Sequence, residues 1–456
     1  MKRKAIDYIS PTQKITFSFL GVIIIGAILL SLPICSKDRN SINFIDALFI
    51  STSATCVTGL VTKIIMHQFN LLGQIIILAL IQIGGIGFMT LVISFTVHIK
   101  HHISMKDKIL LKQQLNQTNL TNIKQNLHNV LKYMFIIEAL GAILLFFKFI
   151  PNYGVLKGIF YSIFITVSAF CNAGFDNLTT TSLIPFSDDV YILIIVMCLI
   201  ILGGLGFIVW FDIKDKLRLC IQKKCSFPYL FQSFSLHTKI VLIMTILLII
   251  CPTIIFLVIE YHSSFFEGQP LLYKIINALF TSITLRTAGF TSIPIEQCHP
   301  ASIFIMILCM FIGGSPGGTA GGIKTTTLAV IILCVICSLK GKINTNVFYR
   351  HISSDIIVQA TTIFTLNLCT LFISVFLLLC FEPFDFIAIL FECTSALATV
   401  GLSMGITSLL SPIGKVILIV LMFIGRIGII TFVMSIVRES KKENDIQYAS
   451  GNIIIG

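Results

Sequence analysis

The chain alternates between long and short apolar runs in an order that occurs four times. The long runs have the roughly 20 residues that a membrane-spanning helix needs. The first long runs cover 15–34, 130–150, 238–260 and 356–381, the short runs 44–56, 158–171, 273–285 and 386–398, and the second long runs 71–97, 189–211, 301–338 and 413–437. The short runs cannot span a bilayer, so each unit is predicted to be a helix, a re-entrant half-helix with a loop, and a second helix.

Two glycine motifs recur in register with this pattern, as internal repeats do. The first motif ends each short run, and the second lies within the second long run. The first reads TSATCVTGL (52–60), VSAFCNAGF (167–175), SITLRTAGF (282–290) and TSALATVGL (394–402), and the second IGGIGF (83–88), LGGLGF (202–207), IGGSPG (312–317) and IGRIGI (424–429). The sequence therefore predicts an all-α polytopic membrane protein of four helix–pore loop–helix repeats. Eight transmembrane helices and four re-entrant half-helices would surround a central pore with pseudo-fourfold symmetry.

Composition and charge support a membrane location and indicate an orientation. Hydrophobic residues make up 56% of the chain and charged residues 11%, against roughly 25% charged in soluble proteins. Most of the 32 Lys and Arg residues lie in stretches that the topology places on one side: 2–14, 100–132, 214–239, 340–350 and 438–442. By the positive-inside rule this side is cytoplasmic, so both termini of a plasma-membrane protein are expected there. The net charge of +12 is then explained by this cytoplasmic bias of Lys and Arg and not by a nucleic acid partner.

The repeats divide the chain into segments with distinct expected roles. We assign residues 1–99 to repeat 1, 100–129 to a cytoplasmic connector, 130–235 to repeat 2, 236–350 to repeat 3, 351–440 to repeat 4 and 441–456 to a cytoplasmic tail. The connector, rich in Gln and Asn, is either a helical interaction segment or a linker. The 14 cysteines mostly fall in apolar runs, so neither disulfides nor a metal site is expected.

The four loops that end the short runs are the predicted functional site. Irregular backbone at membrane depth is tolerated where it lines water or is buried in protein, and its carbonyl groups can replace the hydration shell of a cation. In each copy of the first motif, ions are expected to contact the glycine and the two residues before it. These are Val57, Thr58, Gly59, Asn172, Ala173, Gly174, Thr287, Ala288, Gly289, Thr399, Val400 and Gly401. The alternative is that such glycines only allow close helix packing, which is the favoured interpretation for the second motif.

These residues resemble the Trk/Ktr/HKT superfamily of potassium transporters over essentially the whole chain. The resemblance rests on one glycine in each of four pore loops, on VTGL and RTAGF in the first and third loops, and on the glycine-rich interruption of the third repeat. Eight spans without an additional N-terminal pair look most like the KtrB-type subunit. The resemblance implies a potassium filter, with potassium as substrate, sodium as a candidate activator and no enzymatic activity or cofactor. Gly59 argues for potassium, since plant members with serine at this position prefer sodium.

The stretch GGSPGGTAGGIKTTT (313–327) looks at first like a phosphate-binding loop. It misses the GxxxxGK[ST] pattern because Ile323 precedes Lys324, and no strand comes before it. Pro316 and the glycines weaken a helix, so the second helix of repeat 3 should break near Gly313 and resume around Ile323, while the other repeats carry an ordinary helix. In the resembling family this segment gates the pore. The gating residues would be Gly313, Gly314, Gly317, Gly318, Gly321, Gly322, Lys324 and Arg426.

Four charged residues within the repeats need an explanation. Arg426 in mid-span costs at least about 2.5–3.5 kcal/mol unless it finds partners, and by resemblance it faces the pore and bonds carbonyls of the gating loop. Lys324 is either an electrostatic part of the gate or a lysine that snorkels to the cytoplasmic face. Arg286 is expected to brace the filter from behind, with Glu392 a possible partner.

The resemblance also implies partners that no spacing in the chain reveals. These are a second copy of the chain in a homodimer and a cytoplasmic, ring-forming, nucleotide-binding subunit of the KtrA type. Two other classes stay open. One is a secondary transporter of another solute built from parallel repeats, and the other a membrane-bound nucleotide-driven enzyme that would use Lys324.

Overall fold

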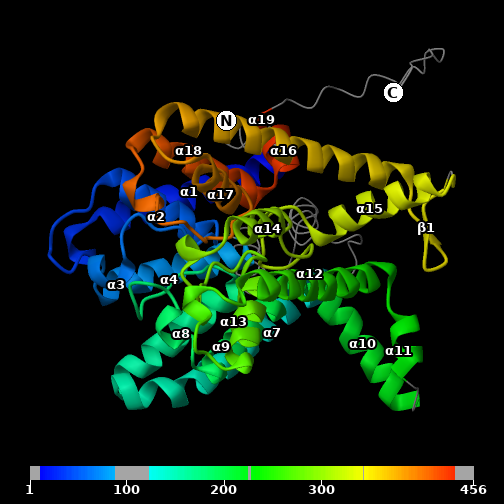
Figure 1. The fold of residues 1–456 in the computed structure, drawn as a ribbon, viewed down its shortest axis with the longest axis horizontal. Coiled ribbons are helices and arrows are strands. Elements are labelled where there is room, and N and C mark those ends of the chain that lie inside the picture. The colour runs from blue at the N-terminus through cyan, green and yellow to red at the C-terminus, as the bar shows by residue number, and fades with distance from the viewer. Residues whose placement is uncertain (1–10, 88–122, 224–226, 343, 437–456) are drawn as a thin grey trace, which may run out of the picture.

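A computed structural model describes residues 11–87, 123–223, 227–342 and 344–436, which form a bundle of helices (Figure 1). Residues 100–122 of the predicted connector and the whole predicted tail 441–456 lie outside this described part. Every repeat contributes the three helices that the hydrophobic pattern predicts.

Each repeat begins with a long apolar helix. These first helices are α1 (Pro11–Ser31), α7 (Ile123–Tyr153), α12 (Leu236–Glu260) and α16 (Ser354–Phe381). They are the helices of the described residues that are long and apolar enough to cross a membrane singly. Large apolar side chains are exposed along them, with Phe147 66% and Val258 72% accessible. Exposed apolar surface of this extent indicates contact with lipid.

A shorter pore helix follows in each repeat and lies inside the bundle. The four are α2 (Phe44–Thr55), α8 (Val155–Cys171), α13 (Leu271–Thr284) and α17 (Phe386–Leu397). Their last five residues are buried, and each packs against the first helix of its own repeat. The short apolar runs are therefore re-entrant helices, as the sequence predicts.

The second helices close the four repeats into a ring. They are α4 (Leu71–Ile86), α9 (Val190–Gly204) with α10 (Phe207–Lys223), α14 (Pro300–Phe311) with α15 (Thr325–Leu339), and α18 (Pro412–Ile427) with α19 (Ile429–Ile436). Each packs on the pore helix of the next repeat: α4 on α8, α9 on α13, α14 on α17 and α18 on α2. The last contact returns to the first repeat, so the predicted pseudo-fourfold arrangement around a central pore is confirmed.

The prediction of ordinary second helices outside repeat 3 is wrong. Helices α9 and α10 are bent by 96° and α18 and α19 by 102°, while α4 ends at a glycine cap. The physical reason is a glycine with positive φ near the end of the second motif, a conformation that ends a helix at little cost. This glycine is the fifth residue of the motif in repeats 1, 2 and 4 and the sixth in repeat 3. The φ angles are +88° at Gly87, +90° at Gly206, +73° at Gly317 and +88° at Gly428.

The packing role expected of the second motif is confirmed at its second position. A methyl group on Gly84, Gly203 or Gly425 would collide with a carbonyl group at the end of a pore helix. Those carbonyl groups belong to Thr55, Phe170 and Leu397, respectively. Small residues at this position thus bring the second helices of repeats 1, 2 and 4 against the pore helices of their own repeats.

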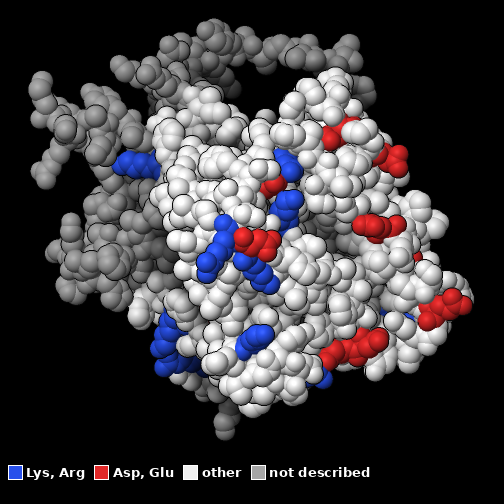
Figure 2. Space-filling view, turned by 90° about the vertical axis from the view of Figure 1, so that its left-hand side faces the viewer, with Lys and Arg blue, Asp and Glu red and all other residues white. Residues whose placement is uncertain are grey.

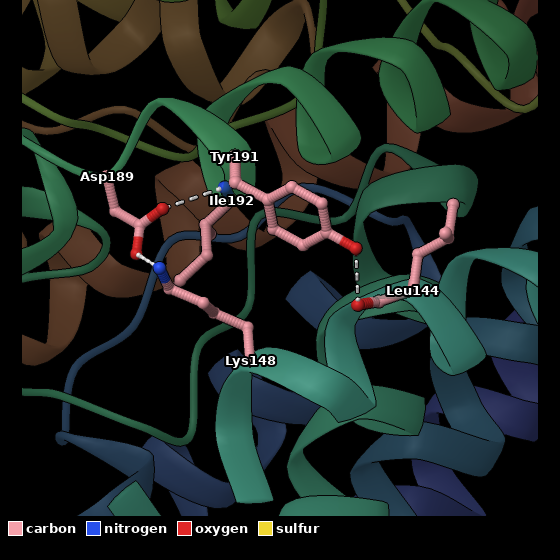
Figure 3. A network of polar contacts seen from close by, with 5 residues as sticks. All are labelled: Leu144, Lys148, Asp189, Tyr191 and Ile192. Atoms are coloured by element: carbon pink, nitrogen blue, oxygen red, sulfur yellow. Dashed lines mark hydrogen bonds and ion pairs between the residues drawn. The ribbon is translucent and has the colours of Figure 1, made fainter. Parts of the chain in front are cut away.

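Short elements connect the helices. They are α3 (Ile65–Gln68), α11 (Phe227–Ser233), a hairpin of β1 (Asn346–Val347) and β2 (Arg350–His351), and the 3-10 turns η2 (Pro33–Cys35), η3 (Ile184–Phe186), η4 (Ser264–Phe266), η5 (Ile295–Gln297) and η6 (Thr407–Leu409). A network of polar contacts fixes the start of α9 to α7 (Figure 3). Asp189 caps the Ile192 N–H and pairs with Lys148 at 2.8 Å, and the Tyr191 hydroxyl donates to the Leu144 carbonyl at 3.0 Å.

A buried ion pair lies where repeat 4 meets repeat 1, the seam between the first and last repeats. Lys415 near the start of α18 approaches Asp46 in the first turn of α2 at 2.7 Å, and their side chains are 12% and 4% exposed. The ion pair links repeat 1 to repeat 4, which are not joined by a connector in the chain.

We expect Lys415→Met to lower stability strongly. Removing one member of a buried ion pair leaves the other charge uncompensated, which costs about 3–5 kcal/mol. The melting temperature in detergent should fall, and the double variant Asp46→Asn/Lys415→Met should recover most of the loss. If the single and double variants melt alike, the pair does not stabilise this seam.

Candidate functional site

The loops after the four pore helices meet in a closed ring. We call Gly59, Gly174, Gly289 and Gly401, all with positive φ, the glycine ring. A methyl group on each would lie against the carbonyl oxygen that precedes the ring glycine of the next repeat. These distances are 2.6 Å from Gly59 to Ala173, 2.7 Å from Gly174 to Ala288 and 2.5 Å from Gly289 to Val400, and Gly401 closes the ring on Thr58. The predicted site residues of all four repeats therefore come together at one place.

The residue two positions before each ring glycine has a left-handed backbone. The φ angles are +57° at Val57, +59° at Asn172, +70° at Thr287 and +53° at Thr399. For a β-branched residue this conformation is an outlier, and such strain persists where the surroundings impose it, often at functional sites. The sequence contains no local signal for it.

Hydroxyl side chains of the pore helices hold the strained loops in place. The Gly59 N–H donates to Ser53 Oγ and the Gly401 N–H to Ser395 Oγ, each at 3.0 Å. In the other two repeats a hydroxyl group donates to the carbonyl after the ring glycine, from Ser168 to Phe175 and from Thr284 to Phe290. Sequence analysis missed these residues, although a hydroxyl residue recurs near the start of the first motif.

Polar side chains beneath the glycine ring have no partner within the described residues. The side chains of Asn172, Thr287 and Thr399 are buried and form no hydrogen bond there, and Val57 occupies the fourth position. Gly321 of the glycine-rich stretch lies directly against the Thr399 side chain. Three of the four repeats thus present free polar groups beside the ring.

An outer cavity of about 450 Å³ opens on the side of the ring that carries residues 60–65. Lys63, Asp176 and Glu296 line it. Acidic and basic side chains both lie near the middle of the face at the left of Figure 1, which carries α2 and α3 (Figure 2). Asp176 is not free, since its carboxylate accepts from the Leu178 N–H at 2.7 Å and the Thr179 N–H at 3.1 Å.

The glycine-rich segment between α14 and α15, residues 312–324, is an ordered loop on the opposite side of the ring. Its ends meet where the Gly313 N–H donates to the Ile323 carbonyl at 2.8 Å, so the helix breaks and resumes where predicted. Thr319 attaches the loop to repeat 2. Its N–H donates to the Gly203 carbonyl at 3.2 Å and its hydroxyl to the Phe170 carbonyl at 3.1 Å.

Gly314, Gly318 and Gly322, three other predicted gating glycines, have close neighbours. A methyl group on Gly314 would collide with Ala320, and one on Gly318 would lie 2.8 Å from the Gly203 carbonyl oxygen. Gly322 adopts a φ of +66°. The loop therefore has little room for side chains at these positions.

Arg426 joins this loop to repeat 1 at the edge of an inner cavity of about 480 Å³. Its guanidinium donates to the Thr319 carbonyl and to the carbonyls of Gly84 and Gly85, the last at 3.3 Å. The expected contact between Arg426 and a carbonyl of the loop is present. Lys324 also lines the inner cavity, half-buried, and its ammonium donates to the Ala320 carbonyl at 2.7 Å.

The suggested pairing of Arg286 with Glu392 is wrong. Arg286 is buried, and among the described residues it donates to the Thr245 hydroxyl of α12 at 3.4 Å and forms no ion pair with Glu392. Glu392 accepts from the hydroxyls of Ser403, at 3.0 Å, and Thr407. It therefore holds the segment after the ring in its own repeat. A sequence shows that two opposite charges exist but not which neighbours each one meets.

Comparison with known proteins agrees with this geometry. Residues 3–446 match the family model described as TrkH, cation transport protein. The chain is 40% identical to the potassium/sodium uptake protein NtpJ of Enterococcus hirae, over 100% of this chain and 99% of that protein. It is 37% identical to the Ktr system potassium uptake protein B of Bacillus subtilis, with the same coverage. The crystal structure of the potassium transporter TrkH from Vibrio parahaemolyticus has the same fold, with a TM-score of 0.71 at 17% identity over 92% of this chain and 83% of that one.

Proposed function

Because this chain belongs to the TrkH family of cation transport proteins, we propose that it conducts potassium into the cell through the glycine ring. The observation that carries the proposal is the closure of the ring, in which each glycine faces a carbonyl oxygen of the next repeat. Carbonyl oxygens converging on one axis can replace the hydration shell of potassium. No carboxylate side chain is needed for this coordination.

The loop 312–324 is proposed as the gate of this pathway. It lies against Thr399 beneath the ring and lines the inner cavity together with Lys324 and Arg426. A loop held by Thr319 on one side and Arg426 on another can block or clear the path by a small displacement. Among the described residues, no soluble nucleotide-binding domain surrounds this loop, which argues against phosphate binding there.

The relatives named as Ktr system proteins support a role as the membrane subunit of a complex. We infer that a cytoplasmic ring subunit of the KtrA type regulates the gate and that two copies of this chain form the membrane part. Both termini would then face the cytoplasm. Sodium is proposed as an activator, in keeping with the potassium/sodium uptake protein among the relatives.

Ion flux into liposomes tests the proposed function. The purified chain, with a KtrA-type ring and a nucleotide that the ring binds supplied, should take up potassium at least about tenfold faster than sodium, a preference of about 1.4 kcal/mol. Uptake of neither ion, together with saturable exchange of another solute, would instead favour the repeat transporter.

A further inference from the structure

Two aromatic residues form the strained tip of the hairpin β1–β2. Phe348 and Tyr349 have φ angles of +49° and +60°, and the flanking Val347 and Arg350 are paired. Positive φ at both central residues defines the type I′ turn, for which Asn-Gly is strongly preferred. Bulky residues in this conformation are strained, and such outliers point to a role other than folding. Tyr349 is fully exposed at 109% relative accessibility, and Phe348 is 42% exposed.

The hairpin is held rigidly although its tip is exposed. Thr345 and Ile352 at its base are each 4% exposed, and the Ile352 N–H donates to the Thr345 carbonyl at 3.0 Å. The Lys239 ammonium lies 5.7 Å from the centre of the Phe348 ring, which connects the hairpin to the start of α12. These contacts anchor the base of the hairpin to the bundle while its tip faces outward.

The position of the hairpin places its tip in the cytoplasm under the proposed topology. It lies at the right-hand end of the molecule in Figure 1, beyond the ends of α12 and α15. Helix α16 next to it has 28 residues, about 42 Å, whereas the hydrocarbon core is about 30 Å thick. Helix α15 begins at the end of the loop 312–324 and is separated from β1 by six residues, so the hairpin and the proposed gate lie at opposite ends of one helix.

Basic residues lie within the hairpin and in the segment before it. Lys340, Lys342 and Arg350 are exposed, and none forms an ion pair with an acidic side chain of the described residues. An acidic surface would complement these charges, and an apolar pocket would bury the Tyr349 ring. Aromatic side chains that enter such pockets, ringed by polar contacts, often dominate binding energy.

We propose that the Phe348–Tyr349 tip is the docking point for an acidic surface of a cytoplasmic protein, which acts through α15 on the loop 312–324. The proposal rests on the proposed function in one respect, namely that this protein is the KtrA-type ring subunit. It adds the site of attachment, the chemistry of the partner surface and the route by which binding reaches the gate.

The double variant Phe348→Asn/Tyr349→Gly tests the docking point without harming the hairpin. It installs the preferred type I′ turn, so the variant should melt at or above the temperature of the wild type in detergent. Binding of a purified KtrA-type ring to the chain in nanodiscs should weaken at least tenfold, and ring-dependent potassium flux should fall with it. The matched control is Tyr229→Ala, which removes a 53% exposed aromatic from α11 and should leave binding unchanged.

A single-tryptophan variant identifies what covers the tip. The chain contains one Trp, so Trp210→Phe/Tyr349→Trp places the only tryptophan at the hairpin. Its fluorescence should be quenched by aqueous acrylamide and become protected when the ring is added. Quenching by brominated lipids in the absence of the ring would overturn the proposal and make the tip a membrane anchor.

The two measurements separate this proposal from the proposed function. A chain that conducts potassium selectively but binds the ring equally well with and without the aromatic tip overturns the docking point and leaves the pathway standing. A chain that binds the ring through the tip but moves no potassium overturns the pathway and leaves the docking point standing.

Discussion

Gly59→Ser should reduce the preference of the protein for potassium over sodium by at least about tenfold, which corresponds to about 1.4 kcal/mol. A side chain at this position would bring Cβ within 2.6 Å of the Ala173 carbonyl oxygen, and φ is +102°. The ring must therefore distort where it is proposed to coordinate the ion, and carbonyl positions matched to potassium are lost. Potassium and sodium flux into liposomes, measured separately, gives the ratio directly.

The control for Gly59→Ser is the same change at Gly21, a glycine of α1 with no neighbouring atom within 4 Å of its added Cβ. Gly21→Ser should keep the flux ratio of the wild type. If Gly59→Ser keeps that ratio as well, while the protein is folded and conducts, the glycine ring does not determine selectivity.

Arg426→Gln should raise potassium flux in the absence of the ring subunit by about 30-fold. At an effective dielectric constant of about 20, two positive charges that pass within roughly 8 Å of each other repel by about 2 kcal/mol, which corresponds to roughly 30-fold in rate. The substitution also removes the guanidinium whose hydrogen bonds connect the Thr319 carbonyl of the loop to the Gly84 carbonyl at the end of α4. Both effects should favour the conducting state, and tracer uptake without the ring subunit measures them.

Arg426→Lys separates the two contributions. Lysine keeps the charge but cannot span the carbonyls of Thr319 and Gly84 as the guanidinium does, so intermediate flux is expected. Arg218→Gln on the exposed part of α10 is the control and should leave flux unchanged. Wild-type or lower flux in a folded Arg426→Gln protein would contradict a blocking role for this residue.

The repeats made the architecture predictable from one sequence. Four copies of each motif in register located the pore helices, and a single unusual copy, residues 312–317, located the broken helix of repeat 3. The gathering of Gly59, Gly174, Gly289 and Gly401 also followed, because symmetry-related segments must lie around a common axis. Such inferences need only spacing and helix length.

Other features depend on contacts that spacing does not reveal. The bends after α9 and α18 escaped prediction because Gly206 and Gly428 fit either a packed or a broken helix, and only φ distinguishes the two. The same limit produced the wrong pairing of Arg286 with Glu392. Buried charges take the nearest available donors or acceptors, and these are set by side-chain direction in the folded bundle.

The most direct test of the central claim is to locate the ion itself. Anomalous diffraction from crystals grown with thallium, which substitutes for potassium, should show a peak on the axis enclosed by the carbonyls of Thr58, Ala173, Ala288 and Val400. The peak should weaken as potassium is added and persist when sodium is added. A crystal of conducting protein with no peak inside the ring, or with its strongest thallium site elsewhere, would contradict the proposal that the glycine ring is the potassium filter.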